Sequence, residues 1–153
     1  MDRLTKRLER EGKIRKQEAG VAQVEALLKE AILDLEEAKK IAEIATRATY
    51  LLAYNAMLKA DRALLLSKGY IPADGGQHKT VVEMTGAFLG KDFQHLCDQF
   101  ESMRRKRNEL TYEAGALMSK SDTKKAFSDA QVLVKQVLTE VKSQNPQLEL
   151  DFE

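Results

Sequence analysis

The stretch ATRATYLLAYNAMLKADRALLLSK, residues 45–68, carries apolar side chains on nearly every side of a helix. A helix that is hydrophobic all round is either buried in a protein core or spans a membrane. No apolar run in this chain approaches the roughly 20 residues that a membrane span requires. We therefore expect residues 45–68 to form the central helix of an all-α protein.

Helical periodicity is also present before this segment. Residues 21–44 place apolar side chains at helical spacing, with acids and lysines on the opposite face. No glycine or proline separates the two helices, which leaves one continuous helix as an alternative. We expect a tight turn near residues 44–49, because this segment is rich in β-branched residues and threonine. The clearest break is GYIPADGGQ, residues 69–77, because glycine, proline and aspartate favour turns.

Three more helices are predicted after this break, over about residues 78–89, 92–118 and 121–143. Gly90 would end the first of them, and Ser121 with Asp122 would cap the start of the last. The core-facing stripe of the last helix consists of Ala126, Ala130, Leu133, Val137, Leu138 and Val141. No strand alternation is evident. The predicted fold is an antiparallel four- to five-helix bundle.

The ends of the chain fall outside this bundle. Residues 1–20 form a charged arm in which Leu4, Leu8 and Ile14 are too sparse to anchor a core. The arm is predicted to be a marginal helix or a mobile leader. The bundle itself is expected over residues 21–143, and residues 144–153 are expected to be a flexible tail.

Composition limits the kinds of site that the chain can carry. The 25 basic and 24 acidic residues give a net charge of +1, so a basic site must be local. The single Cys97 excludes an intramolecular disulfide, and we expect it to be a buried small hydrophobe in a cytoplasmic protein. With only two histidines, we expect no metal site, and we expect no cofactor and no membrane association.

One arginine occupies a position where the core would require an apolar residue. The helix predicted over residues 92–118 has a seam of Phe93, Leu96, Phe100, Met103, Arg107, Leu110, Ala114 and Leu117. Burying an unpaired guanidinium costs several kcal/mol. An acid, a water-filled cleft or an anionic ligand must therefore compensate Arg107. A structural salt bridge, for example to Asp61, is the simpler explanation.

Polar residues surround Arg107 on the same helix. Arg104, Asn108 and Tyr112 follow one another at one-turn spacing, which suits binding a phosphate and stacking a base. Tyr54 and Asn55, on the central helix, can line the same cleft or make ordinary core hydrogen bonds. His78 at a helix start can contact a phosphate or serve as a cap.

The segments YLLAYNAMLKADRALLLSKGYIP (50–72), HKTVVEM (78–84) and RNELTY (107–112) together resemble the HEPN domains of bacteria and archaea. Residues 54–57 and 62–65 are similar to the aromatic and small-residue helix of that family. His78 matches its loop histidine, and residues 121–138 are similar to its last helix. The resemblance covers about residues 25–140.

The resemblance implies a helical bundle that dimerises, with the arginine-motif helices paired across a cleft. In the RNase members, the motif is an arginine followed, after four to six residues, by a histidine. Here Asn108 follows Arg107 as in the family, but the partner position holds Tyr112, which does not titrate near neutral pH. The chain resembles the arginine–tyrosine subgroup, which implies the binding site of the family more than its RNase reaction.

The tail QLELDF, residues 147–152, is similar to the peptide by which bacterial proteins dock onto the DNA sliding clamp. The partner-binding residues would be Gln147, Leu148, Leu150 and Phe152. The last three alternate along the chain, as they would in an extended segment that enters a pocket. A frayed terminus, or a tail folded on its own dimer, is the alternative.

Three functions remain open. The first is a homodimer that binds a nucleotide or RNA without catalysis, as part of a defence or toxin–antitoxin system with an antitoxin or nucleotidyltransferase partner. The second is a helical adaptor that recruits a partner such as the sliding clamp. The third is a metal-independent RNase toxin in which Arg107 and Tyr112 are catalytic. We expect the first, and rank the adaptor ahead of the RNase.

Overall fold

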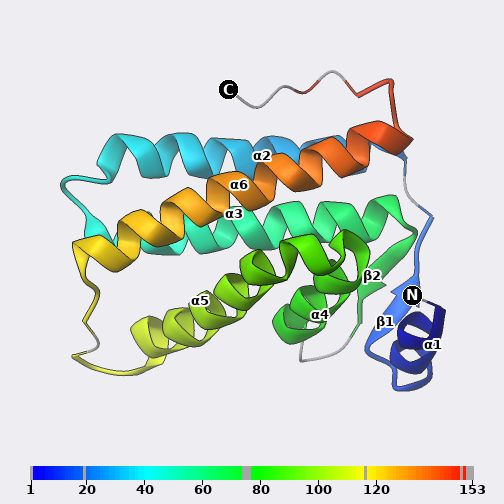
Figure 1. Cartoon of the computed structure of the whole chain (residues 1–153), viewed down its shortest axis with the longest axis horizontal. Helices are drawn as coiled ribbons and strands as arrows, with labels where there is room; N and C mark the ends of the chain where they lie inside the picture. The colour runs from blue at the N-terminus through cyan, green and yellow to red at the C-terminus, as the bar shows by residue number, and fades with distance from the viewer. Residues whose placement is uncertain (1, 19, 74–76, 116, 149, 151–153) are drawn as a thin grey trace.

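The computed structural model describes residues 2–18, 20–73, 77–115, 117–148 and 150. They form helices with one small antiparallel sheet (Figure 1). The helices are α1 (Asp2–Arg10), α2 (Val21–Ile41), α3 (Thr46–Ser67), α4 (Gln77–Leu89), α5 (Gln94–Tyr112) and α6 (Lys120–Gln144). The strands are β1 (Ile14–Lys16) and β2 (Tyr70–Pro72). The predicted helical bundle is confirmed, with a sheet added to it.

α3 is the central helix, as its apolar composition predicted. α2 and α6 pack on one side of it, and α4 and α5 lie along the other (Figure 1). Small residues such as Ala53, Ala56 and Ala60 are fully buried and allow close approach, while burial of Met57 and Leu64 stabilises the fold by about 1.5–3 kcal/mol each. None of the described helices combines the length and the apolar composition that crossing a membrane requires.

α2 and α3 are two helices and not one. α2 ends at Ile41 and α3 begins at Thr46, so the turn lies slightly earlier in the chain than predicted. The backbone of Ala45 leaves the helical conformation, and the hydroxyl of Thr49 donates to its carbonyl oxygen at 2.8 Å. α4 matches its predicted range and is followed by Gly90 at φ 86°, a conformation that glycine adopts readily.

The end of α5 and the start of α6 differ from the prediction. α5 ends at Tyr112, and the backbone of Glu113 is extended. Leu117 is 83% exposed and therefore does not continue the core seam. α6 begins at Lys120, one residue before the predicted range. Its cap is Ser119, whose side chain accepts a hydrogen bond from the backbone N–H of Asp122 at 3.0 Å. The predicted core stripe of α6 is confirmed, because all of its residues are buried.

The N-terminal segment is a folded part of the molecule. α1 leads into β1, which pairs antiparallel with β2 in the register Ile14↔Pro72, Arg15↔Ile71 and Lys16↔Tyr70. Leu8 and Ile14 are buried in the common hydrophobic core, although the sequence predicted that they were too sparse to anchor one. The sequence showed no strand alternation, because two three-residue strands are too short to produce a visible one.

Candidate functional site

Arg107 lies in the core-facing seam of α5, between the buried Met103 and Leu110, and its side chain is half-buried. Its Nη1 donates to the side-chain oxygen of Asn108 at 3.3 Å. No ion pair joins Arg107 to any acid in the described parts of the chain. Arg107 therefore lies in the core-facing seam as predicted, and no carboxylate of a described residue pairs with its charge.

The predicted ion pair between Arg107 and Asp61 is wrong. Asp61 is fully buried on α3, and both of its carboxylate oxygens lack a hydrogen-bond partner within the described structure. Burial raises the pKa of Asp61 well above its ordinary value, and the nearby hydroxyl of Thr85 opposes that shift only in part. Asp61 is therefore expected to be protonated, and a neutral acid cannot offset a guanidinium charge.

A tyrosine and a histidine meet within electrostatic reach of Arg107. The hydroxyl of Tyr54, which is completely buried on α3, lies 2.7 Å from Nδ1 of His78 on α4. The ring of Phe100 on α5 packs against Tyr54, with centroids 5.4 Å apart. Three helices therefore fix the position of the imidazole.

The electrostatics of this pair favour neutral side chains. Burial lowers the pKa of His78, and the charges of Arg62, Arg107 and Arg104 lower it further. Burial also raises the pKa of Tyr54 to about 12, so the phenol keeps its proton. The phenol can donate to an unprotonated Nδ1 across this 2.7 Å contact, and the imidazole proton then lies on Nε2.

Arg104 is held differently from Arg107. Its Nη2 lies 2.6 Å from Oε1 of Glu101 and its Nε lies 3.0 Å from Oε2, which makes a two-point ion pair along α5. The hydrogen bonds from Arg104 lower the pKa of Glu101, so the carboxylate stays ionised. Arg105 also contacts Glu101, at 3.4 Å, but its side chain is mostly exposed. Glu101 therefore neutralises part of the basic cluster and leaves Arg107 unpaired.

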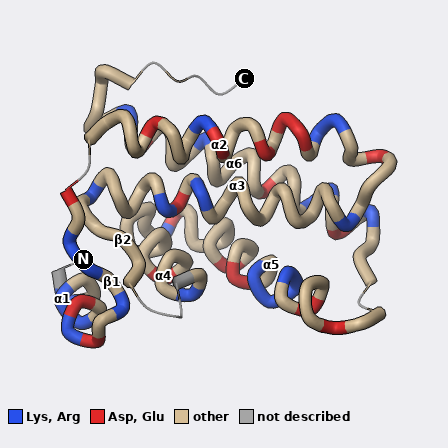
Figure 2. The backbone as a smooth tube through the Cα atoms, turned by 180° about the vertical axis from the view of Figure 1, so that it is seen from behind, with Lys and Arg blue, Asp and Glu red and all other residues tan. Residues whose placement is uncertain are grey.

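The other candidate residues on α3 and α5 are only partly brought together. Asn108 is next to Arg107 and is hydrogen-bonded to it, whereas Asn55 is exposed on α3. Tyr112 ends α5 with 76% of its surface exposed, so within one chain it does not enclose a ligand with Arg107. Figure 2 shows the basic residues of α5 gathered in the middle of that helix.

Arg62 is a site residue that the sequence did not single out for binding. It lies on α3, two turns after Tyr54, and its charge lowers the pKa of both His78 and Tyr54. The eight-residue spacing would have been a usable signal, because such residues share one face of a helix. No group of three or more potential metal-binding side chains occurs in the described part of the chain.

The tail residues proposed for partner docking are placed in part. Gln147 is exposed, but Leu148 is only 5% exposed and belongs to the hydrophobic core, with Leu150 packed against that core. Phe152 lies outside the described residues. Docking through Leu148 would therefore require this side chain to leave the core of its own chain.

Comparison with known families agrees with this architecture. The HEPN domain family matches residues 24–142, from α2 to the last turn of α6. No curated protein matches the chain in a sequence search. Because the match covers most of the sequence and includes the helices that carry Arg107, Tyr54 and His78, the chain belongs to the HEPN family.

Proposed function

We propose that this protein binds RNA or a nucleotide at the cluster formed by Arg107, Asn108, His78 and Tyr54. The observation that carries the proposal is the convergence of positive charge on a neutral histidine: Arg62, Arg104 and Arg107 all lower its pKa. HEPN domains are commonly RNases of defence and toxin systems, so RNA is the natural ligand class for such a site.

The chemistry of the cluster suits a phosphate. Arginine can donate two parallel hydrogen bonds to phosphate oxygens, and Arg107 has no carboxylate competing for it among the described residues. An imidazole with its proton on Nε2 donates a hydrogen bond from that nitrogen. His78 would therefore add a neutral donor beside the guanidinium.

A second copy of the chain would complete the proposed site. HEPN domains typically dimerise and pair with nucleotidyltransferases, and we propose both for this protein. Asn108 and the exposed Tyr112 lie on the outer part of α5. Pairing of two α5 helices would place them and two Arg107 side chains around one cleft.

RNA cleavage is the second candidate function. For this reaction, the position of His78 favours a mechanism that uses this histidine over one that uses Tyr112. A general base at neutral pH must be unprotonated, which the lowered pKa of His78 provides. The hydrogen bond from Tyr54 opposes this role, because it occupies Nδ1 and leaves the proton on Nε2. We therefore propose ligand binding as the main function and RNA cleavage as the second candidate.

Fluorescence anisotropy with a labelled single-stranded RNA tests the binding site. Arg107→Ala should weaken binding about tenfold or more, because hydrogen bonds between charged groups contribute about 1.5–3 kcal/mol. Arg105→Ala is the matched control: it removes the same type of residue from the same helix, at a side chain that is 75% exposed. Equal affinities for the two variants would refute the proposed site.

Incubation of the same RNA with EDTA present tests the RNase function. Cleavage by the unaltered protein that is lost in both Arg107→Ala and His78→Ala would establish it. Expression in bacteria provides the matching cellular assay, since an RNase toxin should arrest growth and Arg107→Ala should relieve the arrest. Equal growth of the two strains, with intact RNA in vitro, would remove the catalytic candidate and leave binding alone.

A further inference from the structure

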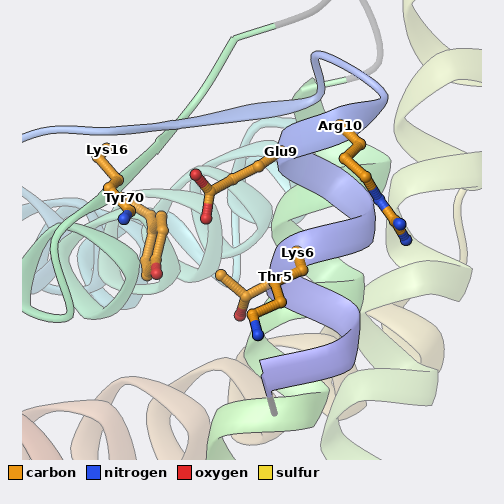
Figure 3. A pocket seen from close by; sticks show the side chains of 6 residues that line it. All are labelled: Thr5, Lys6, Glu9, Arg10, Lys16 and Tyr70. Carbon is orange, nitrogen blue, oxygen red and sulfur yellow. The ribbon is translucent and has the colours of Figure 1, made fainter.

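The N-terminal part of the molecule forms an open groove, far along the chain from Arg107. α1, β1 and β2 surround a volume of about 410 Å³ (Figure 3). Its lining residues are Thr5, Lys6, Glu9, Arg10, Lys16 and Tyr70. Five of these six precede residue 24, where the HEPN match begins, so the family assigns no role to them. The volume falls in the range of about 300–1,000 Å³ that is usual for small-molecule sites.

Strand pairing places an aromatic ring beside an ammonium group. Lys16 and Tyr70 are directly opposite each other in the β1–β2 ladder, so their side chains lie on the same face of the sheet. Glu9 and Thr5 are one turn apart on α1 and face this pair across the cavity (Figure 3). Helix α1 and the β1–β2 ladder therefore form opposite walls of one groove.

The cations of this groove have no ion-pair partner among the acids that the structure describes. Lys6, Arg10 and Lys16 make no ion pair with a described acid, although their neighbours do: Arg7 pairs with Glu83, and Lys13 pairs with Glu11. Lys6 and Lys16 against the single carboxylate of Glu9 leave an excess of positive charge in the groove, and Arg10 adds a further charge on the outer side of α1. Such a groove attracts an anion.

A hydroxyl in the wall is also available to a ligand. Thr5 lines the cavity, and its hydroxyl makes no side-chain hydrogen bond to a described residue and stays open to the groove. A phosphate oxygen in the groove would accept a hydrogen bond from it.

We propose that this groove binds a 5′-phosphorylated ribonucleotide, either free or at the end of an RNA chain. Lys6, Lys16 and the Thr5 hydroxyl would hold the phosphate, and the ring of Tyr70 would stack on the base. The carboxylate of Glu9 would accept a hydrogen bond from a ribose hydroxyl. Arg10 points away from the other five side chains (Figure 3) and would contact a further phosphate.

Isothermal titration calorimetry with ADP and with 5′-phosphorylated single-stranded RNA tests the groove, in the Arg107→Ala background so that the first site contributes little. Lys16→Glu should weaken binding at least tenfold. Lys13→Glu should change it less than threefold, because this lysine lies outside the cavity and is paired with Glu11. The two variants change the net charge equally, so equal losses would overturn the proposal.

Two further measurements separate the ligand sources and the groups. Binding of ADP identifies a free nucleotide as the ligand, whereas binding only of the phosphorylated RNA, and not of the same RNA with a 5′-hydroxyl, identifies a chain end. Glu9→Gln should reduce the preference for ADP over dADP without changing the melting temperature. Absence of binding for both probes at millimolar concentration would overturn the groove while leaving the Arg107 site standing.

Discussion

The half-buried His78 on α4 and the buried Asp61 on α3 are governed by the same effect, the cost of charging a group away from water. Histidine is charged when it is protonated, so this cost lowers the pKa of His78. Aspartate is charged when it is deprotonated, so the same cost raises the pKa of Asp61. Both shifts favour the neutral form of the side chain. Their protonation states depend on local contacts that single substitutions can change.

Replacing Tyr54 by phenylalanine should raise the pKa of His78. The phenol stabilises the neutral imidazole by donating to Nδ1, while the ring packing against Phe100 is kept in the variant. We expect a stability loss of about 0.5–1.5 kcal/mol, the usual net value of one hydrogen bond. NMR titration of the imidazole signals measures the shift, and the exposed His95 is the internal control. An unchanged His78 titration would contradict the proposed donor.

Replacing Asp61 by asparagine should stabilise the protein near pH 7 and above. The native carboxyl retains its proton to a higher pH than the unfolded chain, whose aspartate titrates near about 3.9. The native state therefore binds more protons above that pH, and wild-type stability falls as the pH rises toward the folded pKa. Asparagine lacks this loss, so the variant should gain on the order of 1 kcal/mol at pH 8.

Thermal melts of both proteins from pH 4 to pH 8 measure this effect. The advantage of Asp61→Asn should shrink toward pH 4, because the carboxyl of the unfolded wild type becomes protonated as the pH approaches about 3.9. A variant that is less stable than the wild type at every pH would show that Asp61 is ionised and paired in the folded protein.

At the scale of elements, short segments are stabilised by what they contact. The nine residues of α1 are too few for a stable isolated helix. A sheet of two three-residue strands also has little stability of its own. Together they bury Leu8 and Ile14 against the bundle. The end of α5 is similarly fixed from outside, because Nη2 of Arg47 donates to the carbonyl oxygen of Leu110 at 3.1 Å.

Leu8→Ala tests whether the N-terminal elements are part of the cooperative fold. Removing a fully buried leucine side chain should cost about 2–5 kcal/mol in the free energy of unfolding. Leu33→Ala, at a half-exposed position of α2, is the matched control and should cost less than about 1 kcal/mol. Urea denaturation measures both. A Leu8→Ala value as small as that of the control would mean that α1 contributes nothing to the bundle.

At the scale of the whole molecule, large apolar side chains are exposed at one end of the bundle. Ile44 in the α2–α3 turn, Tyr112 at the end of α5 and Leu117 before α6 are all more than three-quarters exposed. Figure 1 shows that these three connections lie at the same end, away from β1 and β2. Grouped apolar exposure of this kind is typical of a surface that contacts another molecule.

We predict that the protein is a dimer and that Tyr112→Asp shifts it toward the 17.2 kDa monomer. A charge placed in an apolar contact between two α5 helices would have to be buried or would separate them. Thr111→Asp is the control, because this neighbouring side chain is also exposed and gains the same charge. Light scattering after size-exclusion chromatography measures the mass. A wild-type monomer at every concentration would rule out the paired cleft.

Comparing prediction and structure shows which elements periodicity can identify. The ranges of α4 and of the α6 stripe were predicted closely, because each buries one face along several turns. The end of α5 was missed, because Glu113 becomes extended where the sequence still offers apolar residues at helical spacing. The α6 cap was placed at Ser121 and not at Ser119, since neighbouring serines offer the same side-chain acceptor.

The sequence by itself determined the helical bundle, its central helix α3, and the presence of an arginine in the apolar seam of α5. These follow from the spacing of residues along a helix, which is a local property. Only the tertiary structure decided that His78 contacts Tyr54, that Asp61 does not pair with Arg107, and that Lys16 faces Tyr70. Those contacts join residues far apart in the chain, and their geometry is set by how the helices and strands pack together.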